Sequence, residues 1–198
     1  MTAIRARSYH HGDLRAELLQ RAEATLRESG VDGLSLRQLA RDTGVSHGAP
    51  TRHFRDKQAL LDALAVAGFE RLGADFENLT PTTSSTDTIH TMARTYLRFA
   101  TENSALLALM FARRHSPVAG DVMSQAVDRA FAIPVTLIAE AQARGEIIPG
   151  DPRRIALTAV AALQGLATFL ASGLVAPEAA DEWLEDLVDH VMLGLQPR

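Results

Sequence analysis

The chain has 198 residues, of which 46% are apolar and 22% are charged, and it contains no cysteine. This composition supports a real core in one or two small domains, and it excludes disulfide staples, thiol catalysis and cysteine-ligated zinc. The formal net charge is −4, yet residues 1–57 hold ten Lys/Arg against seven Asp/Glu, a local excess typical of a nucleic-acid-binding head on a more acidic body.

The chain begins with a basic stretch and a first helix. Residues 1–11 carry two arginines and no core pattern, so we expect a flexible arm that is either disordered or enters a DNA minor groove. This stretch also lacks the apolar segment of a signal peptide. Asp13–Ser29 places apolar residues at helical spacing, and Gly30 is predicted to end that helix.

Two short helices joined by a tight turn are predicted next. Ser35 is expected to cap the first, in which Leu39 lies at a core position, and Gly44 supplies the left-handed residue that ends it. Ser46 is expected to cap the second helix, and Phe54 is its inward anchor. Two helices around a glycine-containing turn, the second rich in short polar and basic side chains, are typical of a DNA-reading helix-turn-helix.

The remainder of the chain is also predicted to be helical. A fourth helix starts after its cap Asp56 and runs to about Asn78, before a Pro/Ser/Thr-rich break at 79–87. Pro134 predicts a kink or a break near Phe131–Ile133. No segment alternates with period 2, so the fold is predicted to be all-α. The later helices are expected at about 87–102, 104–113, 118–145, 152–174 and 178–195.

The run of residues 33–64 resembles the N-terminal domain of TetR-type transcriptional regulators, and the resemblance extends over about residues 12–70. Two positions depart from the family pattern, because Pro50 stands where leucine is usual and Thr51 stands where a DNA-contacting tyrosine is usual. The resemblance implies a helix-turn-helix head and a body that dimerises through the last two helices. The matching residues are Ser35, Arg37, Leu39–Ala40, Gly44–Val45–Ser46, His53–Phe54, Lys57 and Leu60–Leu61.

The candidate DNA-binding residues divide into phosphate contacts and base contacts. Lys57 lies at a helix N-terminus, where backbone amides also favour anions, so we expect it to bind a phosphate, as the resemblance also implies. Small residues in the second short helix allow close approach to the bases, and the fork of Arg52 is expected to bind either a guanine or a phosphate. The complete predicted set is Ser35, Arg37, His47, Gly48, Ala49, Thr51, Arg52, His53 and Lys57.

The last two predicted helices are the candidates for dimerisation. Residues 155–176 contain no charge, but their polar and small side chains favour a core or dimer-interface helix over a membrane span. An apolar stripe follows from Trp183 to Leu195. We therefore expect a cytoplasmic homodimer that does not enter a membrane. The small residues expected to allow close helix approach are Ala156, Ala159, Ala162, Gly165 and Ala167.

The middle helices are the candidate ligand-binding region, because they supply aromatic side chains and an adaptable methionine. The ligand would be a small, largely apolar molecule that favours a body conformation in which the two heads no longer match the operator spacing. No cofactor and no metal are expected. The predicted ligand-binding residues are Tyr96, Phe99, Met110, Phe111, Phe131, Gln164 and Phe169.

Several other functions compete with this interpretation. A metal- or pH-responsive regulator would combine the same head with histidine-based sensing. An enzyme would need a nucleophile, an acid–base pair, a phosphate loop or a metal cluster, none of which occurs here at working spacing. An architectural DNA-binding protein would leave most of the chain without a role.

We therefore predict a homodimeric repressor of a palindromic operator. Its predicted parts are an arm (1–11), a helix-turn-helix domain (12–57), a connecting helix (58–79) and a ligand-binding and dimerisation domain (80–198).

Overall fold

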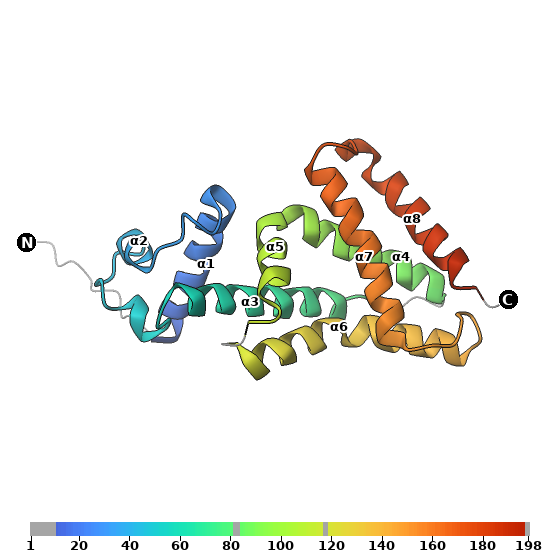
Figure 1. The fold of residues 1–198 in the computed structure, drawn as a ribbon, viewed down its shortest axis with the longest axis horizontal. Coiled ribbons are helices and arrows are strands. Elements are labelled where there is room, and N and C mark those ends of the chain that lie inside the picture. The colour runs from blue at the N-terminus through green and yellow to red at the C-terminus, as the bar shows by residue number, and fades with distance from the viewer. Residues whose placement is uncertain (1–10, 81–83, 117–118, 197–198) are drawn as a thin grey trace, which may run out of the picture.

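The computed structural model describes residues 11–80, 84–116 and 119–196, and these residues contain helices and no strand. The basic arm predicted for the N-terminus lies almost wholly outside the described residues. The helices form a small head at one end of an elongated molecule and a larger helical body at the other (Figure 1). The all-α prediction is therefore confirmed.

The head contains α1 (His11–Ser29), α2 (Leu36–Asp42), a short 3-10 helix (Pro50–Arg52) and the start of α3 (Lys57–Glu77). Helix α1 ends where Gly30 takes φ 66°, as the sequence predicts. Gly44 likewise takes φ 68° after α2, so both turns use a left-handed backbone that glycine adopts without strain. The side chains of Leu18, Leu39 and Phe54 are completely buried between these elements.

The second helix of the predicted helix-turn-helix is shorter than expected. Its only helical residues are the three of the 3-10 helix, and the cap position is Ala49 instead of the predicted Ser46. The reason is Pro50, which has no N–H to donate to the carbonyl of Ser46, so that carbonyl accepts from the amide of Ala49 at 2.9 Å. A bond from the Arg52 amide to the Ala49 carbonyl at 3.2 Å continues the same tight spacing.

Helix α3 connects the head to the body and packs along α6 (Figure 1). Asp56 is its N-cap as predicted, because its side chain accepts a hydrogen bond from the amide of Ala59 at 2.8 Å. The buried residues of head and body form one continuous apolar cluster. The body helices are α4 (Ser85–Glu102), α5 (Ser104–Arg113), α6 (Gly120–Ala143), α7 (Pro152–Ala171) and α8 (Ala180–Gly194), the last preceded by a 3-10 helix (Pro177–Ala179).

Helix α6 remains one helix through Pro134, so the predicted break does not occur. Its N-terminal half lies so close to α3 that a Cβ added to Gly73 would sit 3.2 Å from the Cα of Ala130. Pro134 itself is buried. The packing of the whole helix against α3 and α7 outweighs the lost hydrogen bond, as tertiary contacts often outweigh local preference.

Candidate functional site

The predicted DNA-binding residues gather at the free end of the head, on α2, the 3-10 helix and the start of α3. Ser35, Arg37, His47, Gly48, Thr51 and Arg52 are exposed there. Two members of the set are less available than predicted, because Ala49 packs against the core and His53 is half-buried beside the ring of Phe54. The Thr51 hydroxyl donates to the carbonyl of Gly48 at 2.9 Å, which fixes its direction along the backbone.

Ser35 and Lys57 occupy the helix starts that the sequence assigns to them. Ser35 is the N-cap of α2 in an extended conformation, but its hydroxyl makes no capping hydrogen bond. Lys57 is the first residue of α3 and is half-buried. Helix N-termini present backbone amides that can bind phosphate, although at α3 the Asp56 carboxylate already accepts from the Ala59 amide.

Residues 35–57 carry an excess of positive charge, and the two carboxylates of this segment accept hydrogen bonds that stabilise the head. This segment holds five Lys/Arg against two Asp/Glu. Hydrogen bonds from Gln38 and Arg21 lower the pKa of Asp42, and the Arg21 Nε lies 2.9 Å from its carboxylate, tying α1 to α2. The hydrogen bond from the Ala59 amide lowers the pKa of Asp56 at the start of α3. Both carboxylates stay ionised and exposed, and Asp56 also pairs with Arg55 at 3.1 Å, so the segment keeps a net excess of three positive charges (five minus two).

Two polar clusters join the head to the body. In the first, the buried carboxylate of Asp62 on α3 accepts from the Arg113 Nε at 2.7 Å and from the Ser116 hydroxyl at 3.0 Å. Arg113, the last residue of α5, also donates to the Gln58 side chain at 2.7 Å. In the second, Arg71 of α3 donates to the carboxylate of Glu23 and to the Asn103 side chain at 3.0 Å.

The body contains an inner cavity of about 80 Å³ that is almost entirely apolar. Tyr96 lines it, and the Tyr96 hydroxyl donates to the Gln164 side chain at 2.6 Å. Burial raises the pKa of Tyr96 far above its ordinary value, so the hydroxyl stays protonated. Other lining residues come from α3, α4, α6, α7 and α8 and include Phe76, Met92, Leu137, Val160, Leu163 and Met192.

Most of the predicted ligand-binding residues lie elsewhere. Phe99 and Met110 are buried in the core without lining the cavity, and Phe111 packs edge-on against Phe69 with the ring centroids 6.2 Å apart. Phe131 is half-buried at the core edge, and Phe169 is 44% exposed on the outside of α7. The prediction missed the cavity because its lining is mostly aliphatic. Helical spacing marks such residues as buried but does not say where the packing is incomplete.

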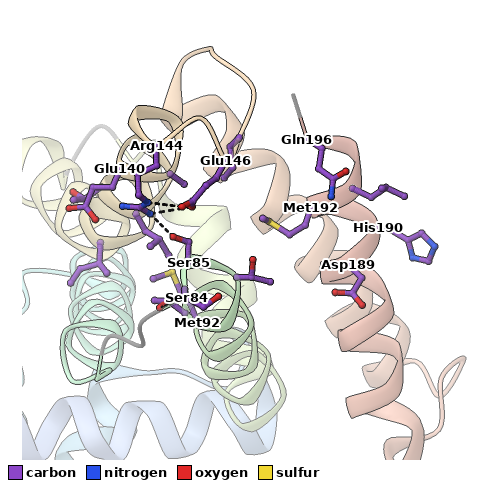
Figure 2. Close-up of a pocket in the computed structure, with 18 of the residues that line it drawn as sticks. Ser84, Ser85, Met92, Glu140, Arg144, Glu146, Asp189, His190, Met192 and Gln196 are labelled. Atoms are coloured by element: carbon purple, nitrogen blue, oxygen red, sulfur yellow. Dashed lines mark hydrogen bonds and ion pairs between the residues drawn. The ribbon is translucent and has the colours of Figure 1, made fainter. Parts of the chain in front are cut away.

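A larger outer groove of about 1060 Å³ opens beside the inner cavity. The end of α6 and the start of α4 form one side of it, and α8 forms the other (Figure 2). The Arg144 Nε donates to the Glu146 carboxylate at 2.8 Å, and Arg144 also hydrogen-bonds the Ser85 hydroxyl. The labelled residues across the groove are Asp189, His190 and Met192 of α8 and Gln196, which follows that helix.

Helices α7 and α8 leave an apolar outer face uncovered. Among the described large apolar side chains, Leu157, Phe169 and Trp183 of these helices and Leu174 of the turn between them are all more than two-fifths exposed, as is Leu193, which also lines the outer groove. The small residues predicted to allow helix approach divide between two faces, because Ala156 and Ala167 point into the core while Gly165 has nothing within 4 Å of an added Cβ. By length and composition alone, α6 and α7 are apolar enough to cross a membrane, as core helices of soluble proteins also are.

No group of three His, Cys, Asp or Glu side chains among the described residues converges as a metal site. The nearest arrangement is His90 of α4, whose Nδ1 lies 2.9 Å from the Glu185 carboxylate and whose Nε2 lies 3.2 Å from that of Asp189. Arg94 also pairs with Glu185. These contacts join α4 to α8 and thereby close one end of the body.

Sequence families match both parts of the chain. Residues 18–64 match the family described as bacterial regulatory proteins, tetR family, and residues 89–191 match the tetracyclin repressor-like C-terminal domain. Two curated relatives match over short segments. These are the class A tetracycline repressor of Escherichia coli, 60% identical over 42 residues, and an HTH-type transcriptional repressor of Mycobacterium tuberculosis, 40% identical over 65 residues. The matches cover 21% and 33% of this chain and only 19% and 35% of those proteins.

Solved structures match nearly the whole chain. A protein of unknown function from Rhodococcus sp. RHA1 is 45% identical with a TM-score of 0.87, covering 97% of this chain and 100% of that one. A putative tetR family transcription regulator from Shewanella sp. PV-4 has a TM-score of 0.75 at 18% identity, covering 93% and 99%. The second likeness concerns the fold alone.

Proposed function

Because this chain belongs to the tetR family of bacterial regulatory proteins, we propose that it is a transcriptional repressor. In this proposal it binds a palindromic operator as a homodimer and is released by a small, largely apolar molecule. It carries out no enzymatic reaction. The observation that carries the proposal is the exposed basic surface of residues 35–57. This surface lies at the start of α3, and the other end of α3 lines the inner cavity of the body.

The head supports DNA binding because different residues are suited to phosphate contacts and to base contacts. Arg37 and Lys57 stand at the starts of α2 and α3, where they are suited to phosphates, and Arg52 is exposed on the 3-10 helix between them. The short 3-10 helix offers fewer side chains than a full recognition helix. Sequence choice is therefore expected to depend mainly on Arg52 and His47.

A gel-shift titration against DNA from beside the protein's own gene tests this assignment. Lys57→Ala and Arg37→Ala should weaken binding to all sequences and each reduce the salt slope by about one. Arg52→Ala should cost about 1–3 kcal/mol and relax sequence choice. Arg98→Ala, which removes an exposed arginine of the body, is the control. Unchanged binding and salt slope in all three head variants would refute the assignment.

The outer face of α7 and α8 supports the homodimer. A single chain would leave Phe169 and Trp183 44% and 52% exposed, and large aromatic side chains of that kind are enriched at protein interfaces. A twofold axis through this face would bury the same residues from both copies and would place two heads on one side of the assembly. Two heads are what a palindrome of two half-sites requires.

Analytical sedimentation of variants that introduce a negative charge tests the dimer face. Phe169→Glu and Trp183→Glu should convert the dimer to a folded monomer and abolish tight operator binding, because each would bury an unpaired carboxylate. Val122→Glu changes an equally exposed apolar residue on α6, outside this face, and should leave the dimer intact. A dimer that survives both α7 and α8 substitutions would show that another surface forms the interface.

Helix α3 supports the proposed release by an effector. Its first residue, Lys57, lies at the DNA-binding surface, and Phe76 near its other end lines the inner cavity. A helix of 21 residues spans about 30 Å, so one rigid element connects the two sites. A molecule that binds one position of α3 better than another shifts the spacing of the heads by its differential affinity.

A further inference from the structure

The inner cavity and the outer groove adjoin each other. Both are lined by Met92, Leu137, Ile147 and Met192, so these four side chains form the partition between them. Methionine has three rotatable bonds and adapts its shape more easily than branched residues. A ligand that displaces the thioethers of Met92 and Met192 would therefore join the two spaces into one continuous site.

The inner cavity has the chemistry of a site for an alkyl group. Apart from Phe76 and Tyr96, its lining consists of aliphatic side chains, methionine and proline. Its one hydroxyl, on Tyr96, already donates to Gln164 at 2.6 Å. A polar group placed here would lose its hydrogen bonds to water without replacement, which disfavours it.

The outer groove has the charge of a site for a cation. Glu140, Glu146 and Asp189 line it, and among the lining residues that the structure describes the only Lys/Arg is Arg144. Arg144 already donates to Glu146, at 2.8 Å, and to Ser85, and hydrogen bonds from Arg144 and then Ser85 lower the pKa of Glu146 and keep it ionised. An anionic ligand would have to displace Glu146 from Arg144 while facing Asp189 across the groove (Figure 2). A cation would share Glu146 with Arg144 and Asp189 with His90, whose Nε2 lies 3.2 Å from that carboxylate, but it would meet an excess of carboxylates, among them Glu140.

We propose that the effector is an alkyl cation, an aliphatic amine or quaternary ammonium compound. Its hydrocarbon end enters the inner cavity between Met92 and Met192, and its charge lies in the outer groove near Glu146 and Asp189. This assignment rests on the proposed function, because it names the molecule that the body of the repressor would bind. It also explains why a largely apolar cavity opens onto a rim with an excess of carboxylates.

Calorimetric titration of the intact dimer with three probes of equal chain length tests the assignment. The probes are decyltrimethylammonium, decanoate and decanol, each used below its micelle concentration. The cation should bind most tightly. The double variant Glu146→Gln/Asp189→Asn should weaken the cation about fivefold per removed carboxylate while leaving decanol unchanged. Ala159→Leu, which fills the inner cavity, should weaken all three probes, and its melting temperature checks that it folds.

Each contrary result overturns a distinct part of the assignment. Decanoate or decanol binding as tightly as the cation would refute the charge assignment and leave an effector site in place. Full affinity in a folded Ala159→Leu variant would refute the placement of the alkyl end. If no probe binds but the protein still retards operator DNA in a gel, the ligand class is wrong while the DNA-binding proposal survives.

Discussion

The link between Asp62 and Arg113 gives a sharp test of how the head is fixed to the body. The Asp62 side chain is 7% exposed and that of Arg113 is 21% exposed, so the pair lies in a poorly solvated junction. Arg113→Met keeps most of the side-chain volume but removes the guanidinium. Asp62 would then retain only the Ser116 hydroxyl, at 3.0 Å, and the Gln58 side chain would lose its bond from Arg113.

The expected loss follows from leaving a buried carboxylate without its counter-charge. Removing one partner of a fully buried ion pair costs about 3–5 kcal/mol. Arg113 is partly exposed and Ser116 still donates, so we expect about 3 kcal/mol for Arg113→Met. The double variant Asp62→Leu/Arg113→Met should recover most of that loss, because an apolar pair of similar volume leaves no unpaired charge.

Urea denaturation at a fixed protomer concentration measures these differences, since dimer formation makes apparent stability depend on concentration. Arg114→Met, one residue further along, is the matched control and should change the free energy of unfolding by about 0.5 kcal/mol or less. A loss below about 1 kcal/mol for Arg113→Met would refute the reasoning. A double variant no more stable than the single one would refute it too, because unpaired charge would not then be the cause.

Two further perturbations test other parts of the fold. Gly73→Ala should destabilise the protein by about 1–3 kcal/mol in the same assay, because the new Cβ would meet the backbone of Ala130 and push α3 away from α6; no loss would mean that the two helices can separate freely. Asp42 has a lowered pKa, so its contribution to stability is present above the ordinary aspartate pKa and is lost as pH falls through the lower folded-state pKa. Asp42→Asn should therefore have a lower melting temperature at neutral pH and a shallower decline in acid, and parallel melting curves would contradict this.

The helix boundaries show what local sequence can predict. Gly30 and Asp56 end one helix and begin another as predicted, because a left-handed backbone and a capping carboxylate act through neighbouring atoms alone. The two internal prolines show where local reasoning stops. Pro50 shortens a helix that has few tertiary contacts, whereas Pro134 is accommodated in a long helix that packs along α3.

The interior of the body was harder to predict, because spacing identifies a buried face but not its neighbour. Phe169 and Ala156 both lie on α7 and both fit an apolar pattern, yet Phe169 is 44% exposed and Ala156 is 3% exposed. The cavity exists because five helices pack together incompletely. The sequence of any one helix does not predict this, because the space depends on all five. Of the aromatic residues predicted to line it, Tyr96 does so and Phe99 fills the core elsewhere, and most of the lining consists of aliphatic side chains.

The two polar clusters hold α3 in place, and they therefore limit how a structural change in the body can move the proposed DNA-binding head. Asp62 and Arg71 fix α3 to α1, α5 and the α4–α5 junction at two points along its length. Phe76, which lies beyond Arg71 on α3, lines the inner cavity. A ligand in the cavity therefore contacts the end of α3, while the polar clusters hold this helix at positions closer to the head. A small displacement at Phe76 must then be taken up either by rotation about these contacts or by breaking one of them. In the proposed dimer, rotation would move Lys57 relative to its copy and so change the spacing of the heads on which the proposed operator binding depends.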